Sequence, residues 1–325
     1  MKTYHQTGLT RQMKIGATVL ALAMMSTGVG CGDDFEELET PETCSQELQL
    51  CEANVFLTVE EFEFLRQQDD VIVFDSRGDE GDFEGGHVPG AYFAHWGLLR
   101  DDDGILYEDD EILEGHLVDL GVDQDSTILI YGEGDGSGGD SVAGNFYWTL
   151  EYLGHDDVYL LDGGMSSWLD AEVSAMDTGA VEPEPGSFTV ERREEMVAPF
   201  EEIHEAIESG DRLLLDTRTY DEWTGEDTRN NDVGGHIPDA VHYHWEDLLD
   251  ENAELRSEED LLAELEGLGI EPGSDIIAYC QSGVRSGFFY AVLQELGFPQ
   301  PQNYDGSWHE WSRQAASEDI AVPEE

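Results

Sequence analysis

The chain contains two copies of one sequence pattern, and this internal repeat limits the folds open to it more than any other feature. An apolar run ending in Asp-x-Arg stands at 71–77 and again at 213–218, and each is followed by a Gly-His-x-Pro turn, at 86–89 and 235–238. A further Asp-Gly, with Trp six residues after the Asp, occurs at 162–168 and 305–311. Because the motifs keep their order, the second half is a duplicate of the first, and we expect two domains of one fold.

Each copy alternates short apolar runs with amphipathic stretches. The spacing of apolar residues predicts helices at 59–67, 200–208 and 258–268. Strands that alternate with helices pair in parallel and are covered on both sides, so the sequence predicts an α/β fold with a parallel sheet and helices on both faces in each domain. The chain has 325 residues, of which 39% are hydrophobic, enough for a packed core in both copies.

Cys280 stands where such sheets carry their working groups, at the carboxyl end of a strand. The strand is predicted at 275–279, the loop at 280–286 and the next helix at 287–296. Backbone N–H groups of a tight loop, a helix N-terminus and the charge of Arg285 all stabilise an anion, so a thiolate is favoured and an anionic substrate is held by the same groups. The alternative is a small, buried and inert thiol.

The first thirty residues are typical of an export signal. Basic Lys2, Arg11 and Lys14 precede an apolar run at 15–29 that ends at Cys31, which predicts a bacterial lipoprotein signal at 1–30 with Cys31 acylated. A plain secretory signal is the alternative. Residues 31–54 then form an acidic tether. No lysine follows Lys14, so Schiff-base chemistry is excluded from the mature chain.

The remaining cysteines before the first domain and the net charge give two further expectations. Cys44 and Cys51 lie close together in a compartment that permits disulfides, and we expect them to pair. The chain has 75 acidic and 14 basic residues, a net charge of −61. Such a polyanion is a poor partner for nucleic acid or for an anionic membrane surface. The expected location is the bacterial cell envelope, on a lipid anchor.

Taken together, these motifs resemble a two-domain rhodanese, a thiosulfate or 3-mercaptopyruvate sulfurtransferase, over residues 55–322. The carriers are the Asp-x-Arg strand ends, the Gly-His-x-Pro turns, the Cys280-x-x-Gly283-x-Arg285 loop and the segment 304–308. The resemblance implies a non-catalytic domain at 55–178, where Gly132 stands at the position of Cys280, and a catalytic domain at 197–322. Residues 179–196, rich in Gly, Pro and charge, are predicted to link them.

The resemblance also implies a mechanism. Cys280 takes a sulfane sulfur from a small anionic donor, holds it as a covalent persulfide with no other cofactor, and passes it to a thiol or cyanide-like acceptor. Arg285 and the loop backbone bind the donor, and Ser282 donates a hydrogen bond; the other expected substrate contacts are Gln281, Gly283, Val284 and Trp308. Four residues separate Cys280 from Arg285, whereas phosphatases of this fold carry five, so a phosphatase is disfavoured.

Two departures from the family pattern leave the identity of the sulfur donor open. Glu222 occupies the position of a substrate-binding Arg in vertebrate-type members, and Arg229 in the following longer loop is either its replacement or a surface residue. Ser282-Gly283-Val284 resembles the mercaptopyruvate loop, while Arg285 resembles thiosulfate-using bacterial members. The rival interpretation is a non-catalytic module of rhodanese fold that binds or senses persulfides.

Two groups of possible metal ligands have structural alternatives. His242 and His244 lie on one face of a strand, but His244-Trp245 repeats an earlier His-Trp pair and suggests packing. In the loop at 132–140, Glu133, Asp135 and Asp140 could surround calcium, although a solvated remnant of a lost active loop is commoner. We expect no metal site.

Overall fold

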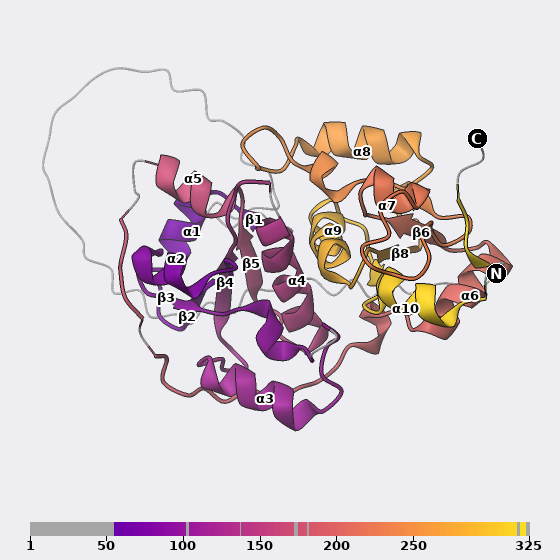
Figure 1. The fold of residues 1–325 in the computed structure, drawn as a ribbon. Helices are drawn as coiled ribbons and strands as arrows, with labels where there is room; N and C mark the ends of the chain where they lie inside the picture. Colours follow the sequence, from indigo (N-terminus) through magenta and orange to yellow (C-terminus); the bar gives the residue numbers. More distant parts are fainter. Residues whose placement is uncertain are drawn as a thin grey trace, which may run out of the picture. The chain divides into compact units, whose positions relative to one another are not determined.

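Two parallel β-sheets, one in each copy of the repeat, form the framework of the chain (Figure 1). The computed structural model describes residues 55–101, 104–136, 138–171, 175–180, 182–316 and 319–322. The predicted signal and tether, with Cys31, Cys44 and Cys51, lie outside these residues. Among the helices that are described, none is long and apolar enough to cross a bilayer.

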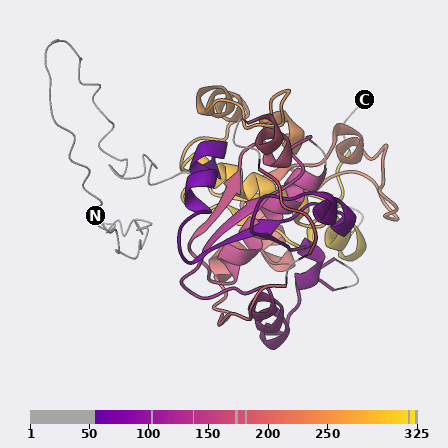
Figure 2. The same ribbon diagram turned by 90° about the vertical axis from the view of Figure 1, so that its left-hand side faces the viewer.

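The first sheet has five strands in the order β1-β5-β4-β2-β3, and every neighbouring pair is parallel. The strands are β1 (Phe56–Leu57), β2 (Val71–Asp75), β3 (Ala91–Phe93), β4 (Thr127–Tyr131) and β5 (Val158–Leu161). The helices between them are α1 (Val59–Leu65), α2 (Glu80–Gly85), α3 (Asp110–Asp119), α4 (Gly138–Tyr152) and α5 (Gly164–Asp170). Helices α1 and α5 lie on one side of the sheet and α4 on the other, and Figure 2 turns this domain toward the viewer.

The second sheet has four parallel strands in the order β7-β6-β8-β9. They are β6 (Leu213–Asp216), β7 (Val241–His242), β8 (Ile276–Tyr279) and β9 (Gln302–Asn303). The helices are α6 (Phe200–Ser209), α7 (Tyr220–Thr224), α8 (Glu258–Gly267), α9 (Val284–Glu295) and α10 (Ser307–Gln314). Helix α9 covers the side toward the first domain, and α6 and α10 cover the other (Figure 1). The predicted α/β fold of two parallel sheets with helices on both faces is confirmed.

Helices α4 and α9 join the two domains through one hydrophobic core. Phe146 of α4 and Phe289 of α9 are buried in the same cluster. The helices approach so closely that a Cβ on Gly144 would lie 2.6 Å from the Cα of Phe288, which leaves no room for any other residue at that crossing. Separating the domains would therefore expose a large apolar area.

The duplicated Asp-x-Arg motifs build the same network in both domains. Arg77 pairs with Asp75 at 2.7 Å, and Arg218 pairs with Asp216 at 2.6 Å. The hydroxyl of the tyrosine that ends the central strand donates to each aspartate, Tyr131 at 2.6 Å and Tyr279 at 2.7 Å. An Asp-Arg ion pair thus stands at the strand end in both copies. The repeat therefore preserves a buried polar network as well as a core.

One predicted element begins elsewhere. The helix expected from Gly287 begins at Val284, with Gly283 as its N-cap in the left-handed conformation (φ 77). A Cβ at Gly283 would lie 2.3 Å from an oxygen of Asp305, so only glycine fits this position. Arg285 consequently stands in the first turn of α9 and not in a loop.

Candidate active site

Cys280 lies at the end of β8, immediately before the turn that leads into α9. Its side chain is free and buried, with 1% of the residue exposed. The thiol thus occupies the predicted place, between the carboxyl end of a central strand and the N-terminus of a twelve-residue helix. Both features favour negative charge on the sulfur.

Residues at the start of α10 hold the loop that carries Cys280. The Ser307 hydroxyl accepts hydrogen bonds from the N–H groups of Cys280, at 3.1 Å, and Gly283, at 2.9 Å, and donates to the Tyr304 carbonyl at 2.7 Å. The N–H of Trp308 donates to the Cys280 carbonyl at 3.0 Å. The Gly283 N–H is therefore engaged by Ser307, and the buried Trp308 ring lies 4.6 Å from the Arg218 guanidinium. Gly283 and Trp308, both predicted as substrate contacts, therefore help to position the Cys280 loop through their backbone N–H groups.

Several groups act on the Cys280 sulfur. Burial raises the pKa of the thiol, but the charge of Arg285, the N–H and hydroxyl of Ser286 and the N–H of Ser282 outweigh burial, and the net pKa is lowered. The hydroxyl near the sulfur belongs to Ser286, and its one proton is directed either at the sulfur or at the Asn303 side-chain oxygen, 2.7 Å away. The sequence prediction had placed that role on Ser282, whose backbone N–H acts instead.

Arg285 forms a two-pronged ion pair with Glu222. Its two terminal nitrogens lie 2.6 and 2.9 Å from the two carboxylate oxygens, and the Glu222 side chain has no exposed area. Burial raises the pKa of Glu222, yet the hydrogen bonds and charge of Arg285 reverse this and lower it to about 2. Glu222, noted above as a departure from the family pattern, is thus the partner of Arg285.

The first domain braces the loop directly. The Gly283 carbonyl accepts from the side-chain amide of Asn145, on α4, at 3.1 Å, and from Asn303 at the same distance. Arg100 donates to Asn145 at 3.0 Å and pairs with Asp305 at 3.0 Å. The loop that carries Cys280 is therefore positioned by side chains of both domains.

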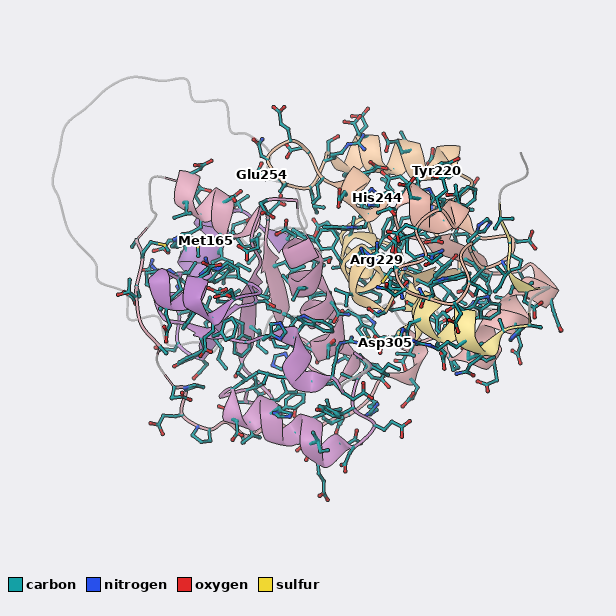
Figure 3. The ribbon with its side chains drawn as sticks, in the orientation of Figure 1. Met165, Tyr220, Arg229, His244, Glu254 and Asp305 are labelled. Atoms are coloured by element: carbon teal, nitrogen blue, oxygen red, sulfur yellow. The ribbon has the colours of Figure 1, made fainter. Side chains whose placement is uncertain are left out.

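The longer loop after α7 reaches the active loop through an amide pair. Asn231 and Gln281 exchange hydrogen bonds of 3.1 and 3.3 Å. The side-chain amide of Gln281 is therefore engaged by Asn231. Val284, another predicted substrate contact, is half-buried in the first turn of α9. Arg229 is exposed two residues before Asn231 and has a positive φ of 48 (Figure 3). Arg229 remains a predicted substrate contact.

In the first domain, an internal carboxylate occupies the corresponding loop. Asp140 accepts hydrogen bonds from the N–H groups of Gly134, at 2.5 Å, and Gly136, at 2.8 Å. The first loop therefore turns its N–H groups onto its own aspartate.

Neither possible metal group is assembled. In the described part of the chain, no three His, Cys, Asp or Glu side chains are arranged to hold a metal ion. His242 Nε2 lies 2.8 Å from the Arg218 carbonyl, and burial lowers the pKa of His244. The hydrogen bond to the Arg218 carbonyl accounts for His242, while the nearest carboxylate to His244 Nε2 is that of Glu246 at 3.9 Å.

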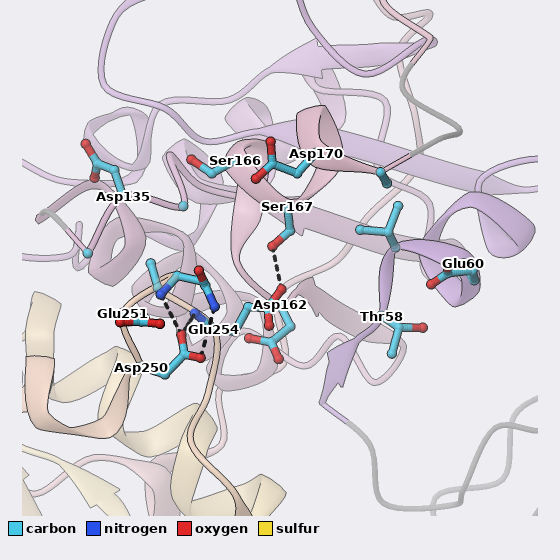
Figure 4. Close-up of a pocket in the computed structure, with 16 residues that line it drawn as sticks. Thr58, Glu60, Asp135, Asp162, Ser166, Ser167, Asp170, Asp250, Glu251 and Glu254 are labelled. Atoms are coloured by element: carbon cyan, nitrogen blue, oxygen red, sulfur yellow. Dashed lines mark hydrogen bonds between the residues drawn. The ribbon is translucent and has the colours of Figure 1, made fainter.

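A cavity of about 600 Å³ lies between the first domain and the loop at 250–254, away from Cys280 (Figure 4). The Ser167 hydroxyl donates to Glu254 at 2.9 Å, and the Leu255 N–H donates to Asp162 at 2.8 Å, so these contacts cross between the domains. Burial raises the pKa of Asp162 to about 7. The cavity is lined by carboxylates and by serine and threonine hydroxyls, and its lining includes no cysteine, histidine or lysine.

Two residues that hold the thiol were missed from sequence. Ser307 stands where the first copy has Gly164, and Ser286 stands where it has Ala143. Both positions differ between the copies, so a comparison of the two repeats could have pointed to Ser286 and Ser307. Asn145 had no such signal, since its role depends on the crossing of α4 and α9.

Known proteins resemble this chain along both copies. The rhodanese-like domain family matches residues 58–171 and 200–314. The thiosulfate sulfurtransferase of Pseudomonas aeruginosa is 33% identical over 231 residues, which are 70% of this chain and 82% of that protein. The sulfur carrier protein TtuD of Thermus thermophilus is 30% identical over 265 residues, 76% of this chain and 86% of that protein. The solved SseA of Escherichia coli, described among 3-mercaptopyruvate sulfotransferases, matches with a TM-score of 0.70 and 25% identity over 78% of this chain and 99% of its own.

Proposed function

This chain belongs to the rhodanese-like domain family, and from that premise we propose that it is a sulfurtransferase that carries a sulfane sulfur on Cys280. The donor is a small anion, thiosulfate or 3-mercaptopyruvate, and the acceptor is a thiol or a cyanide-like nucleophile. The observation that carries the proposal is the buried Cys280 thiol with its lowered pKa, in a loop aimed at a helix N-terminus. A thiolate is the nucleophile that sulfur transfer requires.

In the first half-reaction, the Cys280 thiolate attacks the outer sulfur of thiosulfate. The new S–S bond forms as the bond to the sulfite sulfur breaks, and sulfite leaves with the electron pair. With 3-mercaptopyruvate the C–S bond breaks instead, and the resulting enolate takes a proton. The N–H groups of Ser282 and Ser286 stabilise negative charge at the sulfur throughout.

In the second half-reaction, the acceptor attacks the terminal sulfur of the persulfide and the electron pair returns to Cys280. The electron pair that Cys280 gives to the new S–S bond in the first step returns to it in the second, so no external oxidant or reductant enters. Asn145, Asn303 and Ser307 keep the loop in place between the two steps.

The rival function is a persulfide-binding or persulfide-sensing module without donor turnover. The ion pair between Glu222 and Arg285 favours this function, because the Arg285 charge is already engaged. The relative from Thermus thermophilus is named a sulfur carrier protein, which supports the same idea. The two functions differ in turnover: the enzyme releases many equivalents of product per chain with excess thiosulfate and cyanide, whereas the module releases at most one.

For location, we infer an exported protein anchored by lipid on Cys31. The basic start, the apolar run at 15–29 and the small residues before Cys31 support this. Cys31→Ser should move the protein from the membrane fraction to a soluble or unprocessed form, and wild-type protein without an acyl mass would exclude the anchor. Mass mapping of the 31–54 peptide also tests the Cys44–Cys51 disulfide.

A further inference from the structure

The unassigned feature nearest the thiol is the Glu222 carboxylate. Both of its oxygens bind Arg285, at 2.6 and 2.9 Å, so both terminal nitrogens of the guanidinium are engaged. Arg285 is nevertheless close enough for its charge to lower the pKa of Cys280. Any anion that approaches the sulfur therefore meets the Arg285–Glu222 pair and not a lone cation.

Glu222 is also held from its other side. One oxygen accepts from the N–H of Thr219 at 3.2 Å and from its hydroxyl at 3.0 Å, and this capping box begins α7. The side chain is buried and fixed by three groups, so it cannot easily turn away when a donor arrives. Arg218, the next cation, is already paired with Asp216.

The charges around the sulfur decide which donors fit. Cys280 as a thiolate and Glu222 contribute two negative charges, and Arg285 contributes one positive charge, so the group carries one net negative charge. A dianion such as thiosulfate is repelled by this group more strongly than a monoanion. With Arg285 unpaired, the net charge would be zero and the dianion would lose that disadvantage.

Building on the proposed sulfurtransferase function, we propose that Glu222 is a specificity-determining residue that neutralises Arg285 and makes the site prefer sulfur donors with a single negative charge, the class of 3-mercaptopyruvate, over dianionic thiosulfate. The geometry of the two-pronged pair and its burial carry this assignment. Glu222 acts through Arg285 and takes no part in bond breaking.

The test is the ratio of kcat/KM for thiosulfate to kcat/KM for 3-mercaptopyruvate. Glu222→Gln keeps the capping box, because glutamine serves at that position, but removes the charge. The ratio should rise by about tenfold or more, as expected for one charge removed at short range. Glu226→Gln, an exposed residue of the same loop, is the matched control and should change the ratio by less than about twofold. An unchanged ratio in folded Glu222→Gln overturns the proposal.

A double variant keeps the test decisive if an unpaired buried Arg285 destabilises Glu222→Gln. Glu222→Gln with Arg285→Gln removes both charges, which proteins tolerate better than removal of one. The net charge near the sulfur then equals that of the wild type, so the donor ratio should stay within about threefold of wild type. A selective loss of thiosulfate activity by about tenfold or more would mean that Arg285 attracts dianions despite Glu222, against the proposal.

A binding measurement separates this proposal from the proposed function. Sulfate, an inert dianion, should protect Cys280 from alkylation at a lower concentration in Glu222→Gln than in wild type, with chloride at equal ionic strength as the control. Equal protection in both proteins contradicts the role of Glu222. If neither donor loads sulfur onto wild-type Cys280, the sulfurtransferase proposal fails, and the sulfate result still decides whether Glu222 repels dianions.

Discussion

The loops that follow the central strands of the two domains have diverged, although their surroundings have not. Both domains keep the buried Asp-Arg pair and the tyrosine that bonds to it. In the second domain the loop points N–H groups at Cys280, and in the first it points them at the Asp140 carboxylate. The loop thus surrounds an acidic group in both copies, and only in the second copy is that group a cysteine thiol.

The first domain retains a role because its side chains reach the second active loop. Asn145 bonds to the Gly283 carbonyl, and Arg100 pairs with Asp305. The first domain has Gly132 where the second has Cys280, yet its helix α4 packs closely against α9 and helps to position the loop that carries Cys280. Four predictions test this division of labour.

The largest effect is expected at the nucleophile. Cys280→Ser should lower kcat/KM for sulfur transfer by at least about a thousandfold, because a hydroxyl forms no persulfide. The thermal midpoint should stay within a few degrees, since serine is close to cysteine in size. Steady-state assays and a melting curve check both. Residual transfer near the wild-type rate would place the chemistry elsewhere in the chain.

Arg285→Ala comes next. It leaves the Glu222 carboxylate unpaired and raises the net negative charge beside Cys280 from one to two, so kcat/KM for dianionic thiosulfate should fall by about 10 to 200-fold. The monoanionic 3-mercaptopyruvate should lose less. Arg229→Ala is the parallel variant. Wild-type kinetics in Arg285→Ala with a loss in Arg229→Ala would make Arg229 the anion-binding residue.

A smaller effect should come from the first domain. Asn145→Ala removes the side-chain amide that holds the Gly283 carbonyl, and the misplaced loop should lower kcat by about tenfold with little change in KM. Thr149→Ala is the control, because Thr149 is buried on the same helix and its hydroxyl donates to the Asn145 carbonyl within that helix. If both variants lose stability but neither loses kcat, the first domain supports the fold and not the site.

The smallest effect concerns stability and pH. Asp162 and Asp305 are repeat counterparts, but Arg100 pairs with Asp305, while burial raises the pKa of Asp162 to about 7. The unfolded state binds fewer protons than the folded state between about pH 4 and pH 7, so this carboxyl contributes stability at low pH that is lost as pH rises through about 7. Asp162→Asn should therefore gain about 2 °C or more over wild type at pH 8 and little at pH 4.

Exposed Asp170 lines the same cavity and is the control for that titration. Asp170→Asn should leave the difference between pH 4 and pH 8 unchanged. A flat pH dependence in wild type would mean that Asp162 ionises normally and that the cavity is wetter than its burial indicates.

The repeat made the fold and the place of Cys280 predictable. Apolar runs that end in Asp-x-Arg define the strands, and a parallel sheet brings their carboxyl ends to one edge. The start of α9 was placed three residues late because Gly283 caps the helix by a left-handed backbone and not by a side chain that a sequence signal marks.

The partners of Cys280 and Arg285 were harder to foresee. Glu222 precedes Arg285 by 63 residues and meets it only because β6 and β8 are neighbours. Its sequence context, Thr219-x-x-Glu222, indicates a helix cap, which it also is. Asn145 comes from the other domain, so its contact depends on how two helices cross, and no local pattern encodes that.

The central claim is that sulfur travels on Cys280, and the most direct measurement is the mass of the protein after brief exposure to thiosulfate or 3-mercaptopyruvate. The account predicts one added sulfur atom, located by peptide mapping to Cys280, removed by cyanide or a thiol, and absent in Cys280→Ser. An added sulfur that persists in Cys280→Ser, or wild-type protein that turns over both substrates without ever carrying one, would contradict it.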